Sequence, residues 1–471
     1  MIMMRMALSW PLLVLFFAVA GVTCSATDNN NDNDDNPYAG GFGINLAIHN
    51  ETLAIVSFGA VHLYQRQRQK SNHDQNDHDD DHDTVSTTTQ WSKVGILLCS
   101  TDPSDWSGPT KVWQTNPHES TLFVTNWRDH QVKVVDATTT TAAQKITPFW
   151  RQQQDPFHKP QILQDGGHFG MNVVATSSDQ QHQESSPTLF VSTGGNVHAF
   201  CRDPKGQFQF IQELEIGQQE IPKDETIGYS LAASGNKVVA GGFSHLYLWT
   251  KTGDDSTTEC KRGHSSSLRN LQEKQPATSP SPPSWKLTHA LPTWSLNTME
   301  RSIDMDANLV AVGYSPPIYP FGQGGSVVIY KVKKNRLQKF QTLRGWTSDF
   351  FGLSVALQDG ILAVGAPEKV EIYEQHGKKK RFRHKQTLQD PSYRKKKSPM
   401  NLFGQNVAIS NGTIVVGAYL KGASPGVGSG AAFVYTKDPT TGKWTLLQEL
   451  SGRDPIVELQ EDAQQEQSVV S

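Results

Sequence analysis

The 471-residue chain contains only four cysteines and shows no excess of charge, with 43 basic against 46 acidic side chains. So few cysteines cannot build a disulfide scaffold of this length, and no Cys-x-x-Cys pair suggests a zinc or redox motif. A formal net charge of −3 excludes a globally basic nucleic-acid-binding protein. No His-Glu-x-x-His or comparable motif is present, so we expect neither a metal nor a cofactor.

Long hydrophobic runs are also missing. The only candidate covers residues 12–22, well short of the roughly 20 residues that span a bilayer. It follows Arg5 and precedes small residues, which predicts a cleaved signal peptide over residues 1–26 and a polar linker over 27–40. We therefore expect a secreted or extracellular protein, or one retained in the secretory pathway, with no membrane span after cleavage. Export favours a disulfide, but no spacing indicates the pair.

What the chain does have is internal repetition. The clearest copy begins at Phe351 and reads FGLSVALQDGILAVGAPEKVEIYEQ. Alternating apolar residues between Leu353 and Leu357 predict one strand, and Asp359-Gly360 is a favoured two-residue hairpin turn. The apolar runs that follow predict three more strands, which complete a four-stranded antiparallel meander.

Seven units of this kind can be drawn between residues 41 and 450. A single small sheet exposes its apolar faces, whereas sheets packed radially bury them against one another. The sequence therefore predicts an all-β fold, a seven-bladed β-propeller of four-stranded antiparallel blades. Biased composition predicts disordered insertions at 66–90 and 251–284, and a disordered acidic tail at 451–471.

The best-preserved unit, with Phe351-Gly352 and Gly365-Ala366-Pro367, resembles the FG-GAP repeat family, whose propeller also forms the head of integrin α subunits. Other units keep parts of the same pattern: Phe403-Gly404 with Gly417-Ala418, Phe169-Gly170 and Phe42-Gly43. The resemblance implies a propeller that recognises other molecules outside the cell.

The calcium loops of integrin-type propellers are not expected in this chain. A calcium cage needs six to eight oxygen ligands, which requires a loop of many residues. The corresponding connections, such as Asn50-Glu51 and Asp359-Gly360, are too short. Asp304 and Asp306 fit a strand that runs into a turn.

Two polar features mark the predicted surface. Asn50 and Asn411 each begin an Asn-x-Thr glycosylation sequon at a predicted hairpin turn. A His/Asp tract containing His73, His78 and His82 could bind divalent metal loosely, or could be a solvated, disordered loop.

A strongly basic segment lies between residues 378 and 397, with Asp390 as its one acid. Its ten basic residues are Lys378, Lys379, Lys380, Arg381, Arg383, Lys385, Arg394, Lys395, Lys396 and Lys397. In an exported protein this segment could bind sulfated or carboxylated polysaccharide. Alternatively, it could be a solvated edge that discourages aggregation between sheets.

The sequence favours a recognition module that binds an extracellular protein or an anionic polysaccharide through its propeller loops, without catalysis and without nucleic acid. The alternative is an extracellular polysaccharide lyase or hydrolase with its site at the channel mouth. Its first candidate residues would be His118, His168, His198 and His245. Ser354 superficially suggests a nucleophile elbow, but Ser230 occupies the same place in another unit, so the repeat explains it better.

Overall fold

The computed structural model describes most of the propeller region and two short flanking pieces. The described residues are 25–26, 41–57, 60–70, 87–98, 110–116, 119–126, 131–136, 142–146, 169–176, 188–193, 195–203, 205, 207–214, 216, 227–252, 284–293, 302–314, 324–345, 350–392, 401–422 and 430–456.

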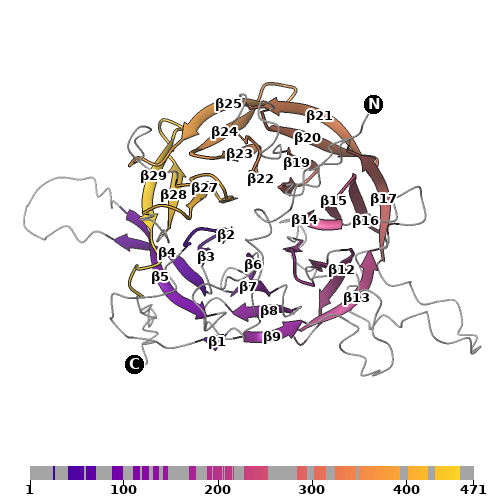
Figure 1. Ribbon diagram of the computed structural model, residues 1–471, viewed down its shortest axis with the longest axis horizontal. Coiled ribbons are helices and arrows are strands. Elements are labelled where there is room, and N and C mark those ends of the chain that lie inside the picture. Colours follow the sequence, from indigo (N-terminus) through magenta and orange to yellow (C-terminus); the bar gives the residue numbers. More distant parts are fainter. Residues whose placement is uncertain are drawn as a thin grey trace, which may run out of the picture.

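Every regular element among these residues is a β-strand, and the strands form antiparallel sheets arranged in a ring (Figure 1). Each sheet contacts the next, and the last contacts the first through β26 and β2, so the ring is closed. No helix in this part of the chain is long and apolar enough to cross a membrane. The expected all-β propeller is confirmed.

The first three sheets occupy the N-terminal half of the chain. Sheet 1 consists of β1 Ser25–Ala26, β2 Asn45–His49, β3 Thr52–Ser57, β4 Ala60–Lys70 and β5 Thr87–Leu98. Sheet 2 consists of β6 Thr110–Asn116, β7 Glu119–Asn126, β8 Gln131–Asp136 and β9 Ala142–Ile146. Sheet 3 consists of β10 Val173–Ala175, β11 Thr188–Ser192, β12 Val197–Arg202 and β13 Phe208–Leu214.

The remaining four sheets follow in chain order. Sheet 4 consists of β14 Ile227–Ser234, β15 Lys237–Gly242, β16 His245–Thr252 and β17 Ser284–Pro292. Sheet 5 consists of β18 Ile303–Asp306, β19 Leu309–Tyr314, β20 Ser326–Lys333 and β21 Arg336–Arg344. Sheet 6 consists of β22 Ser354–Gln358, β23 Ile361–Ala366, β24 Lys369–His376 and β25 Arg381–Leu388. Sheet 7 consists of β26 Val407–Ser410, β27 Thr413–Ala418, β28 Ala431–Lys437 and β29 Trp444–Leu450.

The prediction of seven four-stranded blades needs correction. Six sheets have four strands, whereas sheet 1 has five because β1 pairs with the outer edge of β5, with Ser25 opposite Leu98. The unpaired backbone groups of an outer strand accept a further strand readily. Residues 25–26 are the last two of the segment 1–26 that the sequence assigns to a signal peptide, so no strand was predicted there.

The hairpin turns lie where the repeat predicts them. Asp359 and Gly360 have φ values of 50° and 74°, and Asn411 and Gly412 have φ values of 45° and 70°. Two successive positive φ values are typical of the tight turn that matches the twist of antiparallel strands. The predicted insertions 66–90 and 251–284 are wrong at their ends, where residues 66–70, 87–90, 251–252 and 284 belong to paired strands. Their central parts, 71–86 and 253–283, lie outside the described residues. The 27–40 linker and the metal-tract histidines also lie outside.

The hydrophobic core lies between the sheets. Each of its clusters joins residues of two neighbouring sheets, so every boundary of the ring has its own core. At the boundary between sheets 7 and 1, for example, Val415 and Val434 pack against Leu53 and Ile55, all fully buried. A buried side chain of this size contributes about 1.5–3 kcal/mol. A sheet can bury its apolar faces only against the two neighbouring sheets, so the closed ring, in which every sheet has two neighbours, is the stable arrangement.

The Phe-Gly half of the motif fixes the start of the inner strand in four of the sheets. Four of these phenylalanines, Phe42, Phe169, Phe351 and Phe403, are at most 1% exposed. Each following glycine has a φ between 89° and 94°, a conformation that glycine adopts at little cost. The backbone N–H of that glycine donates to the second strand of the same sheet, as in Gly404 to the carbonyl of Gly417 at 3.0 Å.

The second glycine of the motif is required by the neighbouring sheet. A Cβ on Gly365 would overlap the carbonyl oxygen of Gly404, and one on Gly417 would overlap that of Gly43. Backbones of adjacent sheets therefore approach closely at this point of the repeat. This explains physically why the two halves of the motif occur together.

A repeated glutamine joins the outer strands of neighbouring sheets, a feature that the sequence analysis missed. Its side-chain carbonyl accepts the backbone N–H of an aromatic residue on the next outer strand, and its amide donates to that residue's C=O. All eight distances lie between 2.7 and 2.9 Å. The pairs are Gln212–Trp285, Gln341–Phe382, Gln386–Trp444 and Gln448–Trp91. We call these pairs the glutamine latches.

In each of these sheets the fourth strand has a β-bulge just before the latch glutamine. In sheet 5, for example, the register shifts between Ile329 and Tyr330 of the partner strand β20, which lie opposite Gln341 and Lys339. A bulge twists the strand and re-aims the side chain. The signal in the sequence is the Gln-x-Leu ending of these fourth strands, as in Gln341-Thr-Leu343.

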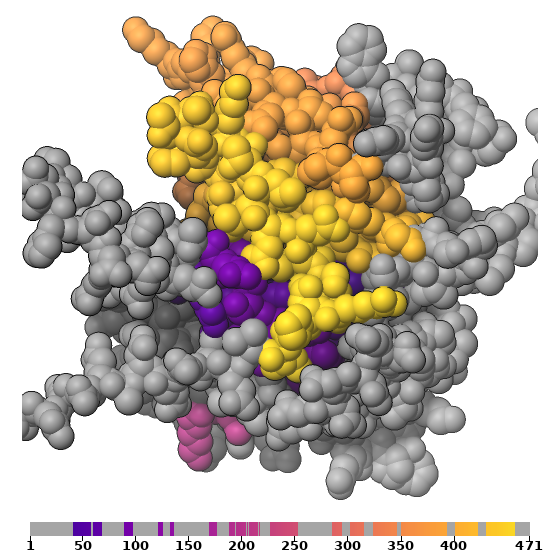
Figure 2. All heavy atoms as spheres, turned by 90° about the vertical axis from the view of Figure 1, so that its left-hand side faces the viewer, coloured from indigo at the N-terminus to yellow at the C-terminus, as the bar shows by residue number. Residues whose placement is uncertain are grey.

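The C-terminal segment closes the ring. In Figure 2 the yellow C-terminal part lies directly on the indigo N-terminal sheet. The Tyr64 hydroxyl donates to the carbonyl of Ser451 at 2.8 Å, and the Lys93 ammonium donates to that of Gly452 at 2.9 Å. Residues 451–456, assigned to the disordered tail in the sequence analysis, are therefore packed against sheet 1.

Candidate functional site

The basic segment is the predicted site that the structure describes best. Lys378, Lys379 and Lys380 form the turn between β24 and β25, and Arg381, Arg383 and Lys385 lie on β25. All six side chains are exposed. Strand β25 lies on the outer circumference of the ring (Figure 1). The other four basic residues, 394–397, lie outside the described residues.

The acids close to this segment have other partners. Asp390, the one acid of the segment, is 4% exposed. Its carboxylate accepts from Asn401 at 2.7 Å and lies 3.3 Å from the ammonium of Lys421. Glu374 pairs with Lys437 of sheet 7 at 2.9 Å. Asp390 is thus buried away from the exposed cations, and Glu374, which lies opposite Arg383 on the neighbouring strand, has its ion pair with a cation of sheet 7.

Glu371 is occupied as well. Its carboxylate lies 3.2 Å from the Lys369 ammonium and 2.6 Å from the His384 ring, and it accepts from the Thr387 hydroxyl at 2.6 Å. Burial raises the pKa of Glu371, but the hydrogen bonds of Thr387, His384 and Lys369 outweigh it and lower the pKa overall. Glu371 thus stays ionised within its own network.

The positive surface continues onto sheet 5, which the sequence analysis did not identify. Residues 326–344 contain six basic side chains and no acidic one. At the junction, the Lys331 ammonium lies 3.9 Å from the centre of the Phe340 ring, and the Arg381 guanidinium lies 5.5 Å from it. Cations of both sheets thus meet on one aromatic ring. The absence of Asp and Glu between residues 326 and 344 was the available signal.

The latch Gln341–Phe382 holds these two outer strands together beneath the cations. Phe382 is 2% exposed, so alternate residues of β25 point inward while Arg381 and Arg383 point outward. The basic surface is therefore carried by two rigid strands.

The two sequons lie side by side at the boundary between sheets 1 and 7. Asn50 is in the β2–β3 turn and Asn411 in the β26–β27 turn, both with positive φ. The Asn411 side-chain amide donates to the side-chain carbonyl of Asn50. The predicted turn positions are confirmed; their glycosylation stays a prediction.

The candidate catalytic histidines do not come together where the structure describes them. His198 is 3% exposed and its ring packs edge-on against Phe169. Burial lowers its pKa to about 4. His245 lies in the neighbouring sheet, and its ring Nδ1 forms a hydrogen bond with the Ser244 hydroxyl at 2.6 Å. His118 and His168 lie outside the described residues.

Other polar candidates join the sheets. The Ser354 hydroxyl donates to the carbonyl of Gly404 at 2.9 Å, which agrees with a role in the repeat. Asp304 and Asp306 accept the backbone N–H groups of Leu357 and Asp359 at 2.6 and 2.8 Å. Within the described ranges, no three His, Cys, Asp or Glu side chains gather as a metal site would require. Cys201, on β12, is disulfide-bonded.

A different junction occurs between sheets 4 and 5. Here His289 stands in place of the latch glutamine, and its Nδ1 accepts one hydrogen bond from the Leu337 N–H at 3.2 Å. Burial, then the charge of Arg336, lowers the pKa of His289. An open groove of about 480 Å³ lies at the same boundary.

The ring of antiparallel sheets makes this protein a β-propeller. The model of the FG-GAP repeat family matches residues 398–435, which hold β26, β27 and the start of sheet 7's third strand. This match and the repeated Phe-Gly geometry support an FG-GAP repeat β-propeller protein.

Solved structures of low identity also match. They include hydrazine synthase of Kuenenia stuttgartiensis, with a TM-score of 0.42 and 11% identity over 89% of this chain and 98% of that one. Hsv2 of Kluyvelomyces marxianus follows, with a TM-score of 0.40 and 9% identity over 85% and 95%. A functionally unknown protein of Desulfotomaculum acetoxidans gives 0.39 and 10% over 71% and 82%. No curated protein matches the chain. At these TM-scores the structural matches carry no argument about function.

Proposed function

We propose that this protein is an extracellular recognition module that binds an anionic polysaccharide through the basic outer surface of sheets 5 and 6. Secretion rests on the predicted signal peptide. The observation that carries the proposal is the set of six exposed cations at 378–385, whose neighbouring acids are committed to other partners. A closed ring of sheets presents such a surface rigidly, so little conformational entropy is lost when a chain binds.

The chemistry of the surface favours a polymer over a small ligand. Exposed lysines and arginines attract anionic groups from a distance, and this attraction weakens as salt screens it. Two neighbouring strands with cations along them can engage successive charges of one chain, which adds the weak contacts together. An acidic extracellular protein is the other partner that this surface could bind.

The test measures binding of heparin and of polygalacturonate to the full chain at 50 mM and 300 mM NaCl. A triple Lys→Gln variant at Lys378, Lys379 and Lys380 should lose at least about tenfold in affinity at low salt. The matched control neutralises three exposed basic residues elsewhere, Lys205, Lys443 and Arg453, and should bind like the wild type. Absence of binding to both polymers, or binding indifferent to salt, would refute the proposal.

The same samples test the enzymatic alternative. Either polymer is incubated with the protein and its chain length is followed by size exclusion. Binding with unchanged length supports recognition, whereas shortening of the polymer would favour a lyase or hydrolase instead.

A further inference from the structure

The boundary between sheets 4 and 5 differs from its neighbours at the outer strands. The described latches hold both backbone groups of an aromatic residue, whereas the His289–Leu337 contact is a single hydrogen bond. Leucine also replaces the aromatic residue on the receiving strand. The groove of about 480 Å³ lies at this same boundary, between sheets 4 and 5.

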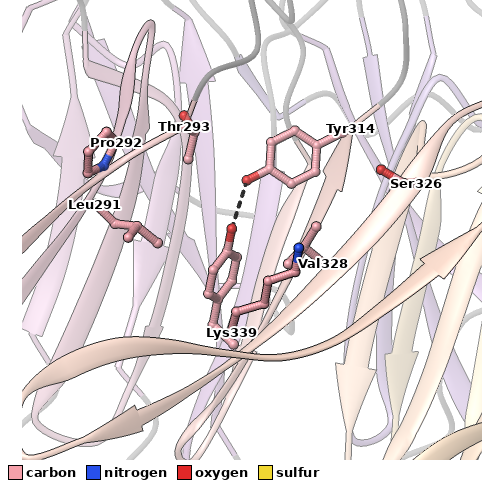
Figure 3. A pocket seen from close by; sticks show the side chains of 8 residues that line it. Leu291, Pro292, Thr293, Tyr314, Ser326, Val328 and Lys339 are labelled. Atoms are coloured by element: carbon pink, nitrogen blue, oxygen red, sulfur yellow. Dashed lines mark hydrogen bonds between the residues drawn. The ribbon is translucent and has the colours of Figure 1, made fainter.

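The groove combines apolar walls with polar groups that converge. Sheet 4 contributes Leu291 and Thr293, and sheet 5 contributes Tyr314, Val328, Tyr330 and Lys339. The hydroxyls of Tyr314 and Tyr330 lie 3.3 Å apart, as the dashed line in Figure 3 marks. Lys339 runs beside Val328 toward the same space in that view. Tyr314 is only half-buried, so part of its ring faces the groove.

Such a lining suits a sugar that carries a negative charge. Sugar rings present apolar C–H faces, which pack on aromatic and aliphatic side chains, and hydroxyls, which exchange hydrogen bonds with tyrosine and threonine. An ammonium group adds a charge-assisted hydrogen bond to a carboxylate or sulfate. A neutral apolar ligand would use the walls but leave Lys339 unused.

The charge of the two walls also favours an anionic ligand. Residues 284–292 and 326–344 together contain seven basic side chains and no acidic one. Arg336 acts electrostatically on His289, which places a second positive charge at this boundary. An anion that approaches the groove along these two segments therefore meets an excess of positive charge.

We infer that the groove between sheets 4 and 5 is a binding subsite for one acidic sugar unit, with Lys339 as the ligand of its carboxylate or sulfate. The inference rests on the proposed recognition of an anionic polysaccharide and names a site apart from β25. The hydroxyls of Tyr314 and Tyr330 then bind sugar hydroxyls, and the polymer continues from the groove across sheet 5.

Calorimetry with trigalacturonic acid and with a sulfated heparin disaccharide tests the subsite on the full chain. Whichever of the two acids binds identifies the anionic group. Lys339→Gln should weaken that binding about tenfold or more, because a hydrogen bond to a charged group contributes about 1.5–3 kcal/mol. Tyr314→Phe keeps the ring and should cause a smaller loss. The methyl ester of trigalacturonic acid, which has lost its charge, should bind the wild type no better than it binds Lys339→Gln.

Lys443→Gln is the matched control. It removes one exposed positive charge from sheet 7, away from the groove and from the basic surface of sheets 5 and 6. Its effect on the short ligands should be slight. The subsite is wrong if neither acid binds, or if Lys339→Gln and Lys443→Gln behave alike. If both acids fail while the polymers still bind at Lys378–Lys380, the subsite falls and the proposed function stands. If the short acids bind and the polymers do not, the proposed function falls instead.

Discussion

The latch between the last and first sheets can be tested by one nearly isosteric change, Gln448→Met. The Gln448 side chain accepts the Trp91 N–H at 2.8 Å and donates to the Trp91 carbonyl at 2.9 Å. Methionine keeps the length and volume of glutamine but makes neither bond. Trp91 is 1% exposed, so water does not readily replace the lost partners.

The expected loss follows from two hydrogen bonds. Each contributes about 0.5–1.5 kcal/mol net, and a buried group left without a partner costs about 1–3 kcal/mol. The free energy of unfolding should therefore fall by about 2–4 kcal/mol. The Trp91 amide should also exchange its hydrogen faster than in the wild type, because the local opening of this boundary becomes easier.

Urea unfolding, followed by tryptophan fluorescence, measures the first quantity, and native-state hydrogen exchange measures the second. Gln338→Met is the control, because Gln338 is an exposed glutamine on an outer strand. Its effect should stay within about 0.5 kcal/mol. Equal stability of the two variants, with unchanged exchange at Trp91, would show that the latch does not hold the ring closed.

Three further predictions concern the same framework. Gly417→Ala should destabilise the protein by about 1–3 kcal/mol in urea unfolding, because the new Cβ would overlap the neighbouring backbone, whereas Gly195→Ala, which meets no atom within 4 Å, should not. Burial lowers the pKa of Lys93 to about 8 from 10.5, so the unfolded chain binds that proton more tightly. The free energy of unfolding should therefore rise by up to about 3 kcal/mol between pH 8 and 10.5, and Lys93→Met should abolish the rise. Because the pKa of His289 is lowered in the folded chain, stability should fall as pH drops below 6.5, where the unfolded chain takes up a proton that the folded chain does not yet bind. Protonation of Nδ1 in the folded chain would also remove its hydrogen bond from Leu337. His289→Gln should restore a two-bond latch and flatten thermal stability between pH 5 and 7; an unchanged pH profile would contradict this.

The repeat itself could be predicted from the sequence because its signals are local. Alternation from Leu353 to Leu357 and the Asp359-Gly360 turn depend on the geometry of one strand and one hairpin. The Phe-Gly and Gly-Ala pairs likewise identified the family, since each occurs within one short stretch of chain. The exposed basic turn at 378–380 followed from composition and the hairpin pattern alone.

What the sequence left open involves contacts between sheets. Asp390 belongs to the basic segment in sequence, but the fold buries it beside Lys421 of the next sheet. The fifth strand of sheet 1 depends on which outer edge is free to accept it.

The continuity of charge across Phe340 and the groove beside Tyr314 arise from residues far apart along the chain. Local propensity determines strands and turns, whereas the closure of the ring determines which side chains become neighbours. For that reason the sequence alone determined the propeller and its basic turn, and only the tertiary structure decided where a ligand could bind.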